Sequence, residues 1–155
     1  PYCFEPPIAP HLAAEQAGAA IDLATIAKAY RKLAAVADIV IVEGVGGFCV
    51  PLNRNEGGAD LAQRLGLPVI LVIGLRLGCL NHALLTVQAI RAKGLTLAGW
   101  ITNRIDPAMA AAERNVAALA ERLAAPLLGV VEFTAAPDPR RVAVQLALPN
   151  LAKSS

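Results

Sequence analysis

The chain has 155 residues, of which 56% are hydrophobic, 4% aromatic and 17% charged, which suits one substantial core. A formal net charge of +2, without a run of Lys or Arg, argues against nucleic acid or a membrane surface as a partner. Three widely separated cysteines, Cys3, Cys49 and Cys79, argue against a disulfide framework or a zinc site. We expect neither a signal peptide nor a membrane span, and therefore a cytoplasmic protein that acts on small molecules.

The spacing of apolar residues predicts helices that alternate with short buried strands. The expected helices are residues 23–35, 59–65, 81–93 and 108–123, and the expected strands are residues 38–43, 69–74, 95–105 and 126–131. Strands that alternate with helices in this way pair in parallel through right-handed crossovers. The sequence therefore predicts an α/β protein, one domain over residues 1–155, with a doubly wound, mostly parallel sheet and helices on both faces.

Polar residues follow the predicted strands. Residues 38–43 form a β-branched run that we expect to be covered on both faces of the sheet. Ligands of such sheets bind beyond the carboxyl ends of the strands. Glu43, residues 74–81, Asn103 and Glu132 are therefore expected at one edge of the sheet.

The first motif is Glu43-Gly44-Val45-Gly46-Gly47. An acid at the end of a strand is placed like the carboxylate that holds magnesium in nucleotide-binding α/β folds. The glycines that follow it allow close approach of the backbone to a ligand. The alternative interpretation is a glycine-rich turn with an exposed Glu.

The second motif, residues 74–82, turns through two glycines into a helix that we expect to begin near Asn81. A helix start suits a carboxylate or a phosphate, although Asn81 alone would also serve as an N-cap. We interpret His82 as a surface residue. Cys79 lacks a recognisable base partner and is not expected to be a nucleophile.

Asn103 lies near the end of the expected strand that begins at Leu95. Its side-chain amide has both a donor and an acceptor for a nucleobase edge, while the alternative is a turn-forming Asn. A phosphate-binding G-x-x-x-x-G-K-[ST] loop is missing from the sequence. Either this is not a nucleotide enzyme, or the part that grips the triphosphate precedes Pro1. We expect the fold to be incomplete at its N-terminus.

Taken together, these segments resemble dethiobiotin synthetase, a family with a P-loop NTPase-like fold. The most specific of them is Gly-Cys-Leu-Asn-His-Ala-Leu-Leu-Thr, residues 78–86. The other matching segments are residues 42–48, 51–52, 67–72, 95–103 and 125–129. The resemblance covers nearly the whole chain, to about Val131, and identifies the chain as the C-terminal part of such a domain.

The resemblance implies an ATP- and Mg²⁺-dependent cyclo-ligase of biotin biosynthesis. Such an enzyme converts 7,8-diaminononanoate and CO₂ into dethiobiotin and works as a homodimer with its substrate site at the subunit interface. The catalytic lysines of the family would precede Pro1, so no catalytic residue is assigned here. We expect residues 1–155 to be inactive alone.

The resemblance also assigns roles to individual positions. Glu43 would be the magnesium ligand. The substrate carboxylate would be bound by Leu77, Gly78, Cys79, Leu80 and Asn81. The ATP site would comprise Glu43, Gly44, Val45, Gly46, Asn103, Arg104, Glu132, Phe133 and Thr134, with Asn103 on the adenine.

Two positions depart from the family pattern. Arg104 stands where an acid often follows the adenine-binding Asn, and residues 131–134 replace a Pro-containing stretch that packs on adenine. These departures predict looser base selectivity. Two alternatives remain open: a P-loop relative that amidates cobyrinate, and a non-catalytic dimerisation or binding module of the same fold.

Overall fold

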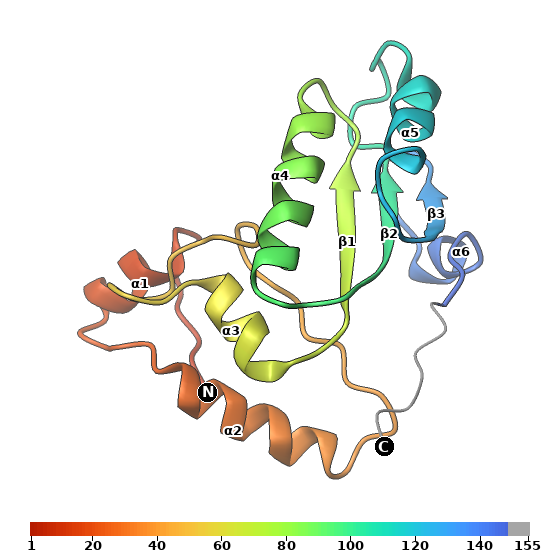
Figure 1. Cartoon of the computed structure of the whole chain (residues 1–155). Helices are drawn as coiled ribbons and strands as arrows, with labels where there is room; N and C mark the ends of the chain where they lie inside the picture. The colour runs from red at the N-terminus through yellow and green to blue at the C-terminus, as the bar shows by residue number, and fades with distance from the viewer. Residues whose placement is uncertain (149–155) are drawn as a thin grey trace. The chain divides into compact units, whose positions relative to one another are not determined.

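The computed structural model describes residues 1–148. The ribbon of the whole chain is shown in Figure 1. The chain divides into two compact units, Pro1–Leu67 and Pro68–Ser155, and each unit has its own hydrophobic core. The expected single domain stays a prediction. Among the described residues, no helix has the length and apolar character needed to cross a membrane.

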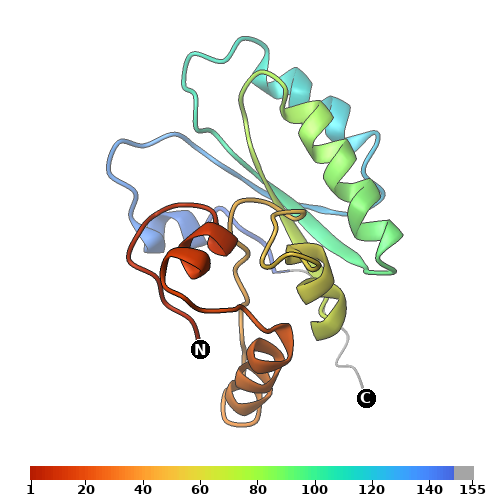
Figure 2. The ribbon, with the colours of Figure 1, turned by 90° about the vertical axis from the view of Figure 1, so that its left-hand side faces the viewer.

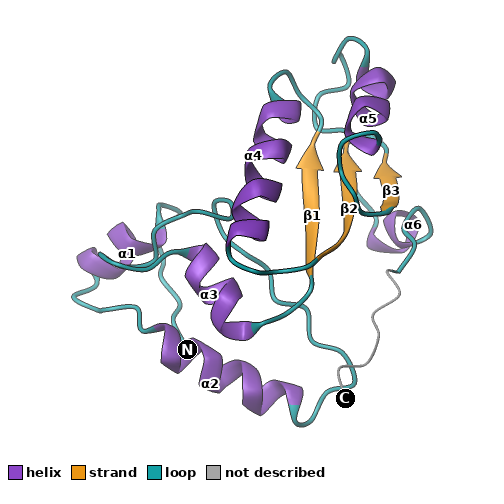
Figure 3. Ribbon diagram, viewed as in Figure 1, coloured by secondary structure: helices purple, strands orange, loops and turns teal. Residues whose placement is uncertain are grey.

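The first unit consists of helices joined by long loops (Figure 3). The helices α2 (Leu23–Ala34) and α3 (Gly58–Leu65) confirm two expected helices, whereas α1 (Pro10–Gln16) was not expected. The carboxylate of Asp22 caps α2, because it accepts hydrogen bonds from the backbone N–H groups of Ala24 and Thr25 at 3.0 and 3.1 Å. The core of this unit is small and consists of Ala14, Ile21, Leu23 and Leu52.

The strand expected at residues 38–43 is wrong. This segment forms no strand, and Ile39, Ile41 and Val42 are 76%, 88% and 42% exposed instead of being covered on both faces. A strand is stable only when neighbouring strands take up its backbone hydrogen bonds. Within the described part of the first unit, no strand is present to pair with it.

The second unit contains a three-stranded parallel sheet in the order β1 (Val69–Gly74), β2 (Leu97–Asn103) and β3 (Leu127–Val131). Its helices are α4 (Cys79–Ala92), α5 (Ala112–Ala120) and α6 (Pro139–Ala143). Figure 2 shows α4 and α5 on one face of the sheet and the short α6 on the other. The predicted α/β class with parallel strands is confirmed, and so is the presence of helices on both faces.

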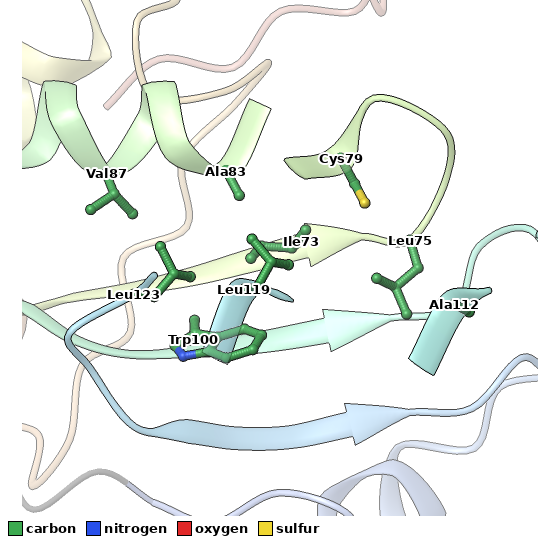
Figure 4. Close-up of a cluster of buried hydrophobic side chains, with 9 residues drawn as sticks. All are labelled: Ile73, Leu75, Cys79, Ala83, Val87, Trp100, Ala112, Leu119 and Leu123. Carbon is green, nitrogen blue, oxygen red and sulfur yellow. The ribbon is translucent and has the colours of Figure 1, made fainter. Parts of the chain in front are cut away.

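The core of the second unit lies between the sheet and the pair α4 and α5. Figure 4 shows Ala83 and Val87 of α4 pointing toward the strands, where Trp100 is fully buried. The indole Nε1 of Trp100 donates a hydrogen bond to the carbonyl oxygen of Ala125 at 3.0 Å, which satisfies its polar atom inside the core. This packing fixes β1 and β2 against the two helices.

The helices α4, α5 and α6 of the second unit each differ from expectation. The helix α4 begins at Cys79 and not near Asn81, because Gly78 adopts φ 93° and caps it. The helix α5 is shorter than residues 108–123, since Ala111 has φ 56° and ends the preceding turn. The helix α6 was not expected, although Asp138 followed by Pro139 is a typical helix start.

Gly129 of β3 permits close approach of the segment that follows α6. The N–H of Ala147 donates to the carbonyl oxygen of Leu128 at 2.7 Å, and Gly129 forms an isolated antiparallel bridge with Leu146. A Cβ atom at Gly129 would overlap the backbone carbonyl oxygen of Gln145. Glycine is therefore required where this segment closes over the sheet.

We expect Gly129→Ala to lower the free energy of unfolding by about 1–3 kcal/mol, the usual cost of overpacking. The control is Val144→Ala, because Val144 is 85% exposed and its truncation should change stability by less than about 0.5 kcal/mol. Urea denaturation followed by Trp100 fluorescence measures both. Equal midpoints for the two variants would contradict the steric role of Gly129.

Candidate functional site

The carboxyl ends of β1, β2 and β3 stand in register at one edge of the sheet. Gly74 pairs with Asn103, and Asn103 pairs with Val131. The N–H of Leu75 donates to the carbonyl oxygen of Asn103 at 2.7 Å. In the same way, the N–H of Arg104 donates to the carbonyl oxygen of Val131 at 2.9 Å. The loops after these strands therefore start side by side, as predicted for residues 74–81, Asn103 and Glu132.

A groove of about 500 Å³ opens at this edge, on the face of the sheet that carries α6. Five of the predicted ATP-site residues line it, namely Asn103, Arg104, Glu132, Phe133 and Thr134. The rest of the wall is apolar apart from main chain and comprises Val72, Ile101, Ile105, Val131, Pro137, Val142 and Leu146. An apolar groove with a few polar groups at one end suits a flat heterocycle.

The sequence analysis missed part of this groove. Pro137, Val142 and Leu146 lie on or beside α6, whose start was recognisable from Asp138-Pro139. What the sequence does not carry is the return of this segment onto the sheet, which depends on the contact with Gly129.

Arg104 is held between two carboxylates. Its NH2 atom lies 2.5 Å from Oε1 of Glu113 on α5, and its Nε lies 2.9 Å from Oε2 of Glu132 after β3. The second contact is an ion pair and not a well-angled hydrogen bond, since the buried Nε lacks a hydrogen-bond partner. The side chain of Arg104 is 22% exposed, compared with 76% for Glu113 and 64% for Glu132.

This ion-pair cluster, Arg104 with Glu113 and Glu132, shifts the ionisation of its members. The hydrogen bond from Arg104 holds the pKa of Glu113 below its usual value. The hydrogen bond to Glu113 and the charge of Glu132 raise the pKa of Arg104, against the opposing effect of desolvation. The guanidinium of Arg104 is thus paired with two carboxylates of the same chain.

A carbon-13 NMR titration of the Glu113 carboxyl tests this cluster. We expect a pKa below that of an ordinary Glu, and Arg104→Met should return it toward the ordinary value of about 4.3. Because the pKa in the folded state is depressed, the pair stabilises the fold above the unfolded-state pKa. That stabilisation is lost as the pH falls through the folded-state pKa.

Arg122→Met is the control variant, because Arg122 pairs with Glu121 and its loss should leave the pKa of Glu113 unchanged. An ordinary Glu113 pKa in the parent protein, or the same pKa in Arg104→Met, would show that the two side chains do not interact in solution.

The turn before α4 carries the residues predicted to bind a substrate carboxylate. Leu77 is 95% exposed and Asn81 is also exposed, whereas Leu80 is half-buried. The side chain of Cys79 is only 2% exposed and packs in the core, so a ligand at this turn would meet its backbone and not its thiol. Asn81 lies in the first turn of α4, where helix N–H groups favour an anion.

A second hollow, of about 300 Å³, lies beside this turn. Its lining includes Arg76, Cys79, His82 and Thr86. Arg76 and His82 are both exposed, and the guanidinium of Arg76 is a cation next to the helix start. The sequence analysis missed Arg76, although a positive charge inside a turn assigned to a carboxylate was a usable signal.

The Glu43 motif lies in the first unit. Glu43, Gly44, Val45 and Gly46 are exposed and follow a segment without regular secondary structure instead of the expected strand. Gly46 and Gly47 have φ 69° and 102°, which only glycine adopts readily. Within residues 1–148, no three His, Cys, Asp or Glu side chains converge on a metal site. A single carboxylate fits Mg²⁺ when phosphates and water supply the other ligands.

A family model described as an AAA domain matches residues 1–141. The ATP-dependent dethiobiotin synthetase BioD of Aromatoleum aromaticum is 62% identical over 97% of this chain and 67% of its own length. Proteins of the same name from Nitrosospira multiformis and a Janthinobacterium species are 53% and 55% identical, over 100% and 99% of this chain and 69% and 66% of their own. The chain spans about two thirds of the length of these relatives.

Proposed function

The chain belongs to the dethiobiotin synthetase family, and from this premise we propose that it provides the adenine site and the substrate-carboxylate site of an ATP-dependent cyclo-ligase. The proposed reaction joins CO₂ to 7,8-diaminononanoate and closes the ring of dethiobiotin, in the cytoplasm. The names of these relatives, ATP-dependent dethiobiotin synthetases, support the ATP dependence and the product.

The observation that carries this proposal is the groove at the edge of the sheet. The sequence assigned Asn103, Phe133 and Thr134 to the nucleotide, and the structure gathers these three residues around one hollow. In the proposal, the amide of Asn103 pairs with the adenine edge by donating and accepting hydrogen bonds. Phe133, which is 48% exposed, offers an aromatic surface for the ring.

The proposal assigns Mg²⁺ to Glu43, together with ATP phosphates and water. The ion would neutralise charge on the triphosphate during phosphoryl transfer. Gly44, Val45 and Gly46 would leave the backbone open to the phosphates. The exposed carboxylate and the open glycine turn support this assignment.

The proposal further includes a homodimer. The turn from Leu77 to Asn81 would bind the carboxylate of a diaminononanoate held by the neighbouring subunit. Its support is chemical, because the start of α4 and the cation of Arg76 both favour an anion. The almost fully exposed Leu77 is an apolar group that a subunit contact would cover.

The test uses the protein as its gene encodes it, supplied with ATP, Mg²⁺, bicarbonate and 7,8-diaminononanoate. Mass spectrometry should detect dethiobiotin formed in proportion to ADP. Asn103→Ala should raise KM for ATP about tenfold or more, because a two-point contact with a base is lost. It should leave kcat nearly unchanged, because the adenine is remote from the reacting phosphate.

Asn115→Ala is the matched control, because the amide of Asn115 donates to the carbonyl oxygen of Ala111 within its own helix at 2.9 Å. It should leave both constants unchanged. Saturable ATP binding without any dethiobiotin would favour the non-catalytic binding module. An unchanged KM for ATP in Asn103→Ala would remove the adenine role from the groove.

A further inference from the structure

We propose that Arg104 is a positioning residue that fixes the adenine groove through Glu113 and Glu132 and thereby sets the affinity and base preference for the nucleotide. This inference rests on the proposed function of the groove. Arg104 follows Asn103 directly, so any movement of its backbone moves the residue assigned to the base.

Arg104 connects three elements of the second unit. Its backbone N–H is bonded to Val131 at the end of β3, its NH2 atom meets Glu113 on α5, and its Nε meets Glu132. Both carboxylates follow β2 in the chain, Glu113 within α5 and Glu132 directly after β3. One side chain therefore ties the end of β2 to a helix and to the next loop.

The loop with Phe133 and Thr134 makes few other hydrogen bonds near its start. The N–H of Glu132 donates to Oε1 of Gln145 at 3.1 Å. Thr134 bonds locally, since its hydroxyl pairs with the backbone of Ala136 at 3.3 Å. The ion pair of Glu132 with Arg104 is thus a side-chain link between this loop and the end of β2, in addition to the backbone bond from Arg104 to Val131.

The charges of the ion-pair cluster also bear on base preference. Arg104 carries one positive charge and faces two carboxylates, so the ion-pair cluster has a surplus negative charge beside the groove. A carboxylate accepts hydrogen bonds only. It favours the exocyclic amine of adenine and disfavours the carbonyl oxygen that guanine presents at the same position. Arg104 restrains this charge at the groove wall, where Glu132 is a lining residue.

The resulting expectation differs from the looser selectivity predicted from sequence alone. The positive charge of Arg104 is paired with the carboxylates of Glu113 and Glu132, and its NH2 atom donates to Glu113. The cluster should then tighten the preference for ATP over GTP, and its loss should weaken that preference.

The experiment compares Arg104→Met with Arg104→Lys in the protein as its gene encodes it, with Arg114→Met as control. Arg114 is an exposed arginine of the same helix α5. Arg104→Met should raise KM for ATP roughly three- to tenfold, the effect of losing about one hydrogen bond. It should leave kcat and KM for diaminononanoate unchanged, and it should reduce the ratio of kcat/KM for ATP over GTP.

Arg104→Lys keeps the charge but cannot span both carboxylates, so we expect partial rescue of KM. Arg114→Met should match the parent protein. Thermal melts of all variants separate positioning from folding. A lower melting temperature with unchanged KM and base preference would overturn the inference, as would a fall in kcat alone.

Failure of the inference is distinguishable from failure of the proposed function. If the parent protein forms dethiobiotin and Arg104→Met keeps the parent's KM for ATP and base preference, only the proposed role of Arg104 is wrong. A parent protein that binds ATP but forms no product sinks the proposed reaction, and calorimetry of ATP and GTP with the same variants still decides the inference. Absence of ATP binding by the parent protein would overturn both.

Discussion

The parallel register of β1, β2 and β3 is the constraint on which the candidate nucleotide site depends. Because Gly74, Asn103 and Val131 are paired across the sheet, the residues that directly follow the three strands start from neighbouring positions at one edge of the sheet. Trp100 and the facing side chains of α4 and α5 hold that register from one side. The other side carries α6 and the groove, so the core and the proposed nucleotide site lie on opposite faces of the same strands.

This division explains which parts of the second unit sequence predicted well. The strand β1 was expected at its observed bounds, because a short apolar run between a Pro and a Gly is a purely local pattern. Asn103 was placed correctly at a strand end for the same reason. Arg104 and Glu113 could not be paired from sequence, since their contact depends on how α5 packs. The wall made by Val142 and Leu146 likewise depends on a return of the chain that only Gly129 permits.

The segment at residues 38–43 shows the limit of local patterns in the opposite direction. Its β-branched run is as strand-like as that of β1, and yet Ile41 is 88% exposed. Propensity describes how well a residue fits a pleated surface, and it does not supply the neighbouring strand. The exposed position of Glu43 before a glycine turn matches the alternative interpretation of this motif, whereas the strand that was expected to end at Glu43 is wrong.

The central claim is that the nucleotide base occupies the groove bounded by Asn103, Phe133 and Thr134. Chemical-shift mapping with MgATP on the protein as its gene encodes it tests this most directly. We expect saturable shifts of the Asn103 side-chain amide and of the Phe133 and Thr134 backbone amides. The backbone amide of the exposed Leu85 in α4 should not shift. Saturable ATP binding that leaves Asn103, Phe133 and Thr134 unshifted would contradict the claim.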